Sequence, residues 1–132
     1  MPRLEIDQLT FSAAHYIPGH EGGCGNVHGH TYFVTNIWLE YIATDTMGIA
    51  VDFGIIKDYF RRWDHKLIVP NQDLEDWRKF YRKMDFNLHQ LIGLPQTTCE
   101  YMIGYIKQQL YDLTGYWIHF RLSEGPGQGT RD

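Results

Sequence analysis

Hydrophobic and polar residues alternate along two early segments of the chain. Residues 3–14 and 31–43 are rich in aromatic and β-branched side chains, and both show partial alternation. This pattern is typical of β-strands. The residues between them include several glycines and predict a loop. The first third of the chain is therefore expected to form two strands joined by a glycine-rich connection.

The hydrophobic period becomes helical after Gly54. Apolar side chains recur on one helical stripe, and Asp52 is placed to cap that helix. A second helix is predicted after Thr97-Thr98-Cys99-Glu100, which has the spacing of a capping box, and it should end at Gly115. We interpret Glu100 as part of this cap and Cys99 as a small buried residue.

The remaining segments complete a predicted α+β domain. Residues 116–124 alternate again and predict a last strand, whereas residues 73–94 predict a short basic helix or an ordered insertion. The glycine-rich tail should be loose or add one short strand. One domain over residues 1–132 is expected, with helices on one face of an antiparallel sheet. Its bare face and unpaired edges predict assembly into a homo-oligomer.

Composition narrows the class of protein. A chain of 132 residues with 43% hydrophobic side chains can bury a core of its own. No apolar run approaches the roughly 20 residues of a membrane-spanning helix, and no signal-peptide pattern opens the chain. The two cysteines stand apart, which favours a reduced cytoplasmic protein over a Cys24–Cys99 disulfide.

The charge is unevenly distributed. A net charge of −4 argues against a nucleic-acid partner. Residues 57–83 nevertheless hold eight of the twelve basic side chains, against five acidic ones. These residues either form a solvated helix face or create a local field that attracts an anionic small substrate, such as a phosphate ester.

Three histidines form a pattern that predicts a metal site. His28 and His30 are two residues apart, so both side chains would leave the same face of a strand. With His15 they supply three imidazoles, which leave the fourth position of a tetrahedral zinc ion open for catalysis. Zinc is favoured, although copper, iron and nickel also accept histidine. His20 is the competing ligand because it lies in the same loop.

Four further side chains carry chemistry that the sequence leaves open. Cys24 could close the metal site as a fourth ligand, or act as a free thiolate base or nucleophile beside the cation. Asp64 and His65 are either an ordinary dipeptide or a proton relay. Glu124 follows an alternating strand and is either solvated or functional at the strand's end.

Six short segments, taken in order, resemble the 6-pyruvoyl-tetrahydropterin synthase / 6-carboxytetrahydropterin synthase family. They are FSAAH (11–15), CGNVHGH (24–30), GIAVDF (48–53), DHK (64–66), TTCE (97–100) and SEG (123–125). The gap between Cys24 and the HGH triplet resembles the 6-carboxytetrahydropterin synthase branch. Cys99, Trp63 and the length of residues 71–95 depart from the common family pattern.

The resemblance implies a tunnelling fold. In such a fold the antiparallel sheets of several subunits join into a barrel, commonly in a hexamer, with active sites between subunits. It also implies catalytic zinc on His15, His28 and His30, with Cys24 as the proton acceptor.

The resemblance assigns roles to the other side chains as well. Asp64 and His65 match the family's relay pair. Glu124 matches the acid that anchors the pterin and is often grouped with that relay. Thr98 and Glu100 match a motif that lines the pterin pocket.

The activity implied by the resemblance is that of a lyase. It would convert 7,8-dihydroneopterin triphosphate into 6-carboxytetrahydropterin, releasing acetaldehyde and triphosphate, on the route to 7-deazaguanines such as queuosine. Two alternatives stay open. One is a 6-pyruvoyl product, formed without carbon–carbon cleavage. The other is a non-catalytic, zinc-stabilised assembly module in which Cys24 closes the metal site.

Overall fold

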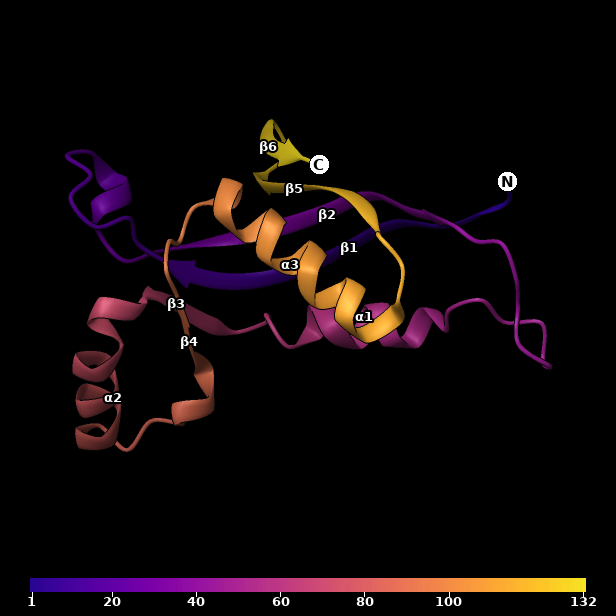
Figure 1. Ribbon diagram of the computed structural model, residues 1–132. Helices are drawn as coiled ribbons and strands as arrows, with labels where there is room; N and C mark the ends of the chain where they lie inside the picture. The colour runs from indigo at the N-terminus through magenta and orange to yellow at the C-terminus, as the bar shows by residue number, and fades with distance from the viewer.

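The computed structural model describes all 132 residues and is built around a six-stranded sheet (Figure 1). Strands β1 (Arg3–His15) and β2 (His28–Glu40) form a long antiparallel hairpin at its centre. Strand β5 (His119–Gly125) pairs antiparallel with β2, and β6 (Gln128–Arg131) pairs antiparallel with β5. These four strands agree with the predicted antiparallel arrangement.

Two further strands make the sheet mixed rather than wholly antiparallel, which corrects the prediction. Strand β3 (Lys66–Pro70) runs parallel to β1, and β4 (Leu91–Leu94) runs parallel to β3. The sheet order is β4-β3-β1-β2-β5-β6. Four consecutive residues of β3 are buried, so the strand lacks the alternation that reveals strands in a sequence.

Helices α1 (Phe53–Arg61) and α3 (Cys99–Thr114) lie on the same face of the sheet, as expected (Figure 1). The predicted cap of α1 is confirmed: the Asp52 carboxylate accepts a hydrogen bond from the Gly54 backbone N–H at 2.8 Å. None of the α-helices combines the length and apolar character needed to cross a membrane.

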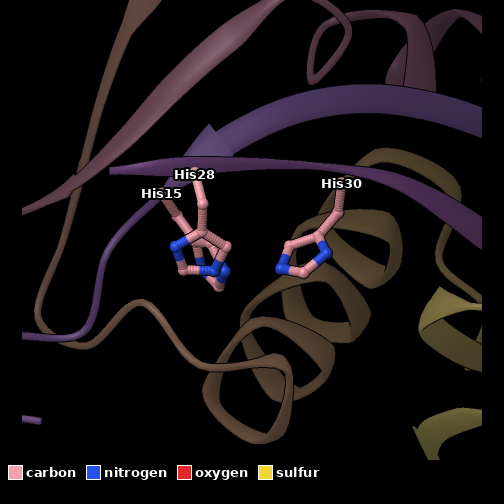
Figure 2. A group of neighbouring side chains, drawn as sticks. All are labelled: His15, His28 and His30. Atoms are coloured by element: carbon pink, nitrogen blue, oxygen red, sulfur yellow. The ribbon is translucent and has the colours of Figure 1, made fainter. Parts of the chain in front are cut away.

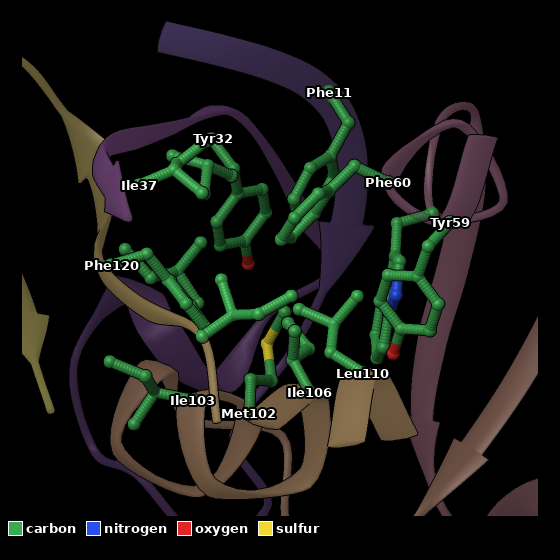
Figure 3. Packing of buried hydrophobic residues seen from close by; sticks show 14 of the residues in the cluster. Phe11, Tyr32, Ile37, Tyr59, Phe60, Met102, Ile103, Ile106, Leu110 and Phe120 are labelled. Carbon is green, nitrogen blue, oxygen red and sulfur yellow. The ribbon is translucent and has the colours of Figure 1, made fainter. Parts of the chain in front are cut away.

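The core fills the space between this sheet face and the two helices (Figure 3). Phe11 of β1 and Tyr32 of β2 stack with ring centroids 4.8 Å apart, and Phe60 of α1 packs beside Phe11. Met102 and Ile106 of α3 are fully buried against them. This packing makes the inward side of β1 and β2 rigid, and the three histidines lie on that side.

Residues 71–95 form a subdomain at one end of the sheet (Figure 1). A short 3-10 turn (Asn71–Asp73) leads into helix α2 (Leu74–Lys83), and a second turn (Leu88–Gln90) leads into β4. The predicted basic amphipathic helix is therefore confirmed. The strand that follows it was not predicted.

Several element boundaries differ from the predicted ones. Strand β2 begins at His28 instead of residue 31, because Gly29 continues the ladder opposite Ala14. The tail is ordered as β6, and the Asp132 carboxylate lies 2.6 Å from the side-chain nitrogens of both Lys107 and His119.

The start of α3 also corrects the sequence interpretation. Thr98 is the cap, and its hydroxyl accepts a hydrogen bond from the Tyr101 N–H at 3.2 Å. The Thr97 hydroxyl instead donates to the backbone oxygen of Tyr16 at 2.6 Å. The predicted capping box from Thr97 to Glu100 therefore does not form, and Glu100 is a first-turn residue rather than part of the cap.

Candidate metal centre

The pairing of β1 with β2 gathers the three histidines on one sheet face. His15 lies directly opposite His28, and Ala13 lies opposite His30. Because side chains two residues apart share a face, all three imidazoles leave the sheet toward α3. One ligand nitrogen from each ring can be chosen so that the three atoms lie within 4.8 Å of one another (Figure 2). The spacing-based prediction of a three-histidine group is thus confirmed in its geometry.

Backbone carbonyls orient two of the rings. The Nδ1 of His15 lies 2.8 Å from the Thr97 oxygen, and the Nδ1 of His28 lies 2.6 Å from the Asn26 oxygen. A carbonyl oxygen can only accept, so both Nδ1 atoms carry the proton and both Nε2 atoms present a lone pair. This is the arrangement of metal-ligating histidines whose second nitrogen is held by an outer group.

The free nitrogens fit a metal ion. The Nε2 atoms of His15 and His30 are buried and have no hydrogen-bond partner. Unsatisfied buried polar atoms are rare in folded proteins and call for an explanation. Ring nitrogens that converge without hydrogen-bond partners are explained by a cation, and three imidazoles are a donor set that suits zinc.

The protonation state of His15 favours the same function. Burial lowers the pKa of this imidazole, against a smaller opposing effect of its hydrogen bond to Thr97. The side chain is only 1% exposed. A neutral ring is the form that binds a metal, so burial prepares His15 for ligation.

Glu124 lies beside the histidine group. Its carboxylate oxygens are 3.6 Å from the Nε2 of His30 and 4.0 Å from the Nε2 of His15. Burial, followed by the charge of Glu124, raises the pKa of the neighbouring Cys99 thiol. The structure thus brings Glu124 to the metal centre, and Cys99 remains a protonated, buried side chain.

A small cavity adjoins Glu124 and contains a second predicted site residue. It has a volume of about 270 Å³ and is lined by Cys99, Glu100, Glu124, Gln128 and Gly129. Glu100 and Glu124 therefore face one cavity, although they come from a helix and a strand far apart in the sequence. Thr98, the third predicted substrate contact, is not among the lining residues, and its hydroxyl is occupied in capping α3.

Cys24 lies in a turn of the loop between β1 and β2. The turn (Gly23–Gly25) is fixed by a 2.7 Å hydrogen bond from the Ile17 N–H to the Cys24 oxygen. A side chain at Gly25 would collide with the backbone oxygen of His20, so this position requires glycine. Cys24 itself is half-buried, and the group of converging ligand atoms consists of the imidazoles without its sulfur.

Asp64 and His65 form a hydrogen-bonded pair at the start of β3. The Asp64 carboxylate is 2.7 Å from the Nδ1 of His65 and accepts a 2.8 Å bond from the Ser12 N–H. The bond from Ser12, with a further contribution from His65, lowers the pKa of Asp64. The pair is therefore assembled as the sequence suggested, with a charged Asp64 orienting the imidazole.

This pair faces away from the histidine group. The His65 side chain is 80% exposed and lines a cavity of about 590 Å³ together with Ser12, Ala14, Gly29 and Thr31. Those four residues alternate along β1 and β2 with the three histidines and their neighbours, so the cavity opens on the opposite sheet face. Ala13 and His30 also contribute to the lining of this cavity, but the His65 ring is not among the ligand atoms that converge on the other face.

One residue of the centre could not be found from the sequence. Thr97 orients His15 through its carbonyl oxygen, a group that every residue possesses, so no side-chain pattern announces it. Its burial, with 1% exposure, is the structural sign of the role.

Comparison with known proteins adds independent findings. Residues 6–130 match the sequence model of the family described as 6-pyruvoyl tetrahydropterin synthase. A Rickettsia bellii protein named 6-carboxy-5,6,7,8-tetrahydropterin synthase is 33% identical over 109 residues, covering 79% of this chain and 77% of its own. A Bacillus subtilis protein of the same name is 41% identical over 67 residues, covering 49% of this chain and 45% of its own.

A solved structure shares the fold. An uncharacterized protein from Wolinella succinogenes aligns with a TM-score of 0.66 at 15% identity, covering 100% of this chain and 98% of that one. At this level of identity the likeness concerns the fold alone.

Proposed function

Because this chain belongs to the 6-pyruvoyl tetrahydropterin synthase family, we propose that it is a zinc-dependent 6-carboxy-5,6,7,8-tetrahydropterin synthase. The substrate would be 7,8-dihydroneopterin triphosphate. With one water consumed, the products would be 6-carboxy-5,6,7,8-tetrahydropterin, acetaldehyde and triphosphate. The observation that carries the proposal is the convergence of three imidazoles beside the Glu124 carboxylate.

The metal would be held by His15, His28 and His30 and, when bound, would supply Lewis acidity toward the side-chain hydroxyls of the substrate. Two Nδ1–H bonds to backbone carbonyls keep the rings of His15 and His28 in the ligating tautomer. Burial lowers the pKa of His15 and so favours the neutral ring that a metal requires.

Glu124 would bind the pterin ring. The guanidine-like edge of a pterin presents parallel N–H donors, which a carboxylate can accept as a bidentate pair. Glu100, in the same small cavity, would complete the polar lining. Since the carboxylate of Glu124 also lies near His15 and His30, the bound ring would place its C6 side chain toward the metal centre.

Cys24 would remove and return protons. A thiolate near a cation is a competent general base, and the loop holding Cys24 is tied to the end of β1, next to His15. In this role the sulfur stays unligated, which leaves an open metal position for substrate.

His65 would exchange protons with the site of an adjacent copy. Asp64 accepts from the Nδ1–H of His65, so the Nε2 of this ring is free to accept or donate a proton. Because the ring faces the cavity on the other side of the sheet, we place it in the active site of a neighbouring subunit in a homo-oligomer. Lys66, which lines the same cavity, supplies positive charge for the triphosphate.

Product identification tests the proposal. The purified, zinc-loaded protein is incubated with 7,8-dihydroneopterin triphosphate, and the products are identified by mass, with acetaldehyde trapped separately. We expect 6-carboxy-5,6,7,8-tetrahydropterin and acetaldehyde, with neither formed by a His28→Ala variant. A 6-pyruvoyl product without acetaldehyde would assign the chain to the other branch, and unconverted substrate would refute the enzymatic proposal.

A further inference from the structure

Helix α2 and the turn before it are hydrogen-bonded to Tyr16, the residue that follows His15. We call this set of contacts the brace. We infer that Tyr16, Asp73, Trp77 and Thr97 are positioning residues that hold the His15 imidazole in its ligating orientation. The inference rests on the proposed function in so far as it concerns a bound metal. It gives the subdomain of residues 71–95 a role beyond covering a surface.

Tyr16 is the residue on which the brace converges. It directly follows His15 at the end of β1, and its hydroxyl makes two hydrogen bonds to the subdomain. The hydroxyl donates to the Asp73 carboxylate at 2.6 Å and accepts from the Trp77 indole N–H at 2.9 Å. Both the donor and acceptor capacity of the hydroxyl are used, so its position is fixed from two sides.

Thr97 connects Tyr16 to the His15 ring through two hydrogen bonds. Its hydroxyl donates to the backbone oxygen of Tyr16 at 2.6 Å, while its own carbonyl accepts from the Nδ1 of His15 at 2.8 Å. His15 and Thr97 are each 1% exposed, so water does not compete for these bonds. A displacement of Tyr16 would therefore move both His15 and the carbonyl that fixes its tautomer.

The subdomain is held firmly enough to act as a brace. Asp73 occupies the N-cap position of α2, yet its carboxylate makes no bond to its own helix and serves Tyr16 instead. Strand β4 also packs closely against the start of α2. A side chain at Gly93 would lie 2.6 Å from the Asn71 amide oxygen and 2.7 Å from the Leu74 side chain.

A simple packing role is the competing explanation. The rings of Tyr16 and Trp77 contact each other with centroids 6.1 Å apart, so α2 could be attached by apolar contact alone. In that case the hydrogen bonds of Tyr16 would contribute to the free energy of unfolding but would not change the tautomer of the His15 ring in the folded protein. The two explanations differ in whether removing one hydroxyl alters the imidazole.

The test measures the His15 ring and its metal affinity in folded variants. Tyr16→Phe removes both hydroxyl bonds while keeping the ring. Asp73→Ala removes the acceptor and Asp73→Asn restores one, and Lys79→Ala on the exposed side of α2 is the control. Zinc affinity is measured by competition with a chromophoric chelator. The His15 tautomer is read from imidazole nitrogen chemical shifts in metal-free protein, with folding verified by circular dichroism.

We expect Tyr16→Phe and Asp73→Ala to weaken zinc binding by about 10-fold or more, as is usual for outer-shell partners. Both should also shift His15 toward a mixture of tautomers, whereas Asp73→Asn and Lys79→Ala should match the unmodified protein. Unchanged affinity and tautomer in folded Tyr16→Phe would overturn the brace. If the unmodified protein binds no zinc, but its His15 tautomer still depends on Tyr16, the metal proposal fails and the brace stands. If the protein binds no zinc and the His15 tautomer is also independent of Tyr16, the metal proposal and the brace both fail.

Discussion

At the scale of single residues, the centre is defined by which imidazole atoms are free. Backbone carbonyls take the Nδ1 protons of His15 and His28, and the Nε2 atoms of His15 and His30 are buried without partners. Ring nitrogens that converge without hydrogen-bond partners form a group that could hold a metal ion. The Cys24 sulfur lies outside this group of ligand atoms, and its proposed role is that of a base.

A Cys24→Ala variant separates the two roles of that sulfur. If Cys24 is the base, turnover should fall by at least about 10²-fold, the usual contribution of a general base, while zinc content stays at that of the unmodified protein. Turnover and zinc stoichiometry are measured on the same sample. Glu21→Ala, an exposed residue of the same loop, is the matched control and should keep both.

Two results would contradict this assignment of Cys24. Loss of zinc together with activity would make the sulfur a ligand, and the centre would then be closed as in a structural site. Full turnover in the variant would show that another group accepts the proton.

At the residue scale, the sequence predicted that the three histidines lie together. The side chains of His15, His28 and His30 carry their own chemistry, and a period of two places the latter pair on one strand face. The role of Thr97 in orienting His15 was not predicted, because Thr97 acts through its backbone oxygen. The sequence did not predict that His65 lies on the other face of the sheet, because β3, the strand that follows His65, has no recognisable sequence pattern.

At the scale of elements, helix α3 links the core to the site. Its N-terminus carries Glu100 at the small cavity and follows directly on the Thr97 carbonyl that orients His15. The Thr98 hydroxyl fixes this end by capping Tyr101. The stability of α3 and the geometry of the site therefore depend on one junction.

Replacing the cap should weaken the fold by a defined amount. Thr98→Ala removes the bond to the Tyr101 N–H and should lower the free energy of unfolding by about 1 kcal/mol, within the range seen for helix caps. Urea denaturation of metal-free protein measures this change. Thr46→Ala, in an exposed loop, should leave the midpoint unchanged. Equal midpoints for both variants would show that Thr98 does not cap α3 in solution.

Helices and strands were predicted best where an amphipathic pattern extends over many residues. The stripes of α1 and α3 and the alternation of β1 and β5 follow from one buried face each. The parallel strands β3 and β4 were missed since they are short and, in β3, almost continuously buried. The predicted strand segment began at residue 31, three residues after the start of β2, although the metal-site prediction already placed His28 and His30 on a strand.

At the scale of the whole molecule, the two sheet faces carry different halves of the proposed site. The histidines and Glu124 lie on the helix-covered face, whereas His65, which is hydrogen-bonded to Asp64, lines the cavity on the other. One chain therefore does not bring its own relay pair to its own metal centre. The sequence predicted both halves but contained no sign of their separation, because that depends on the path of the sheet.

Mixed oligomers test whether the site is shared between subunits. Cys24→Ala and His65→Ala chains should each be nearly inactive alone. If the base and the relay come from different chains, random mixing after dissociation should restore about a quarter of the turnover of the unmodified protein. Turnover is measured before and after mixing, and size-exclusion chromatography establishes that the oligomers have reformed.

The control mixes Cys24→Ala chains with the Cys24→Ala/His65→Ala double variant, which contains no intact thiol. That mixture should stay inactive. An absence of recovery in the first mixture, despite exchange of subunits, would place base and relay in the same chain and contradict the assignment of the His65 cavity.

The most direct test of the account is the absorption spectrum of the cobalt(II)-exchanged protein. Binding to three imidazoles with a vacant position predicts visible d–d bands, at one cobalt per chain, without a strong near-ultraviolet sulfur-to-metal charge-transfer band. The visible bands should disappear in His28→Ala and persist in Cys24→Ala. An intense sulfur-to-metal band in the resting protein, lost on replacing Cys24, would contradict the central claim that the histidine group holds an open metal ion.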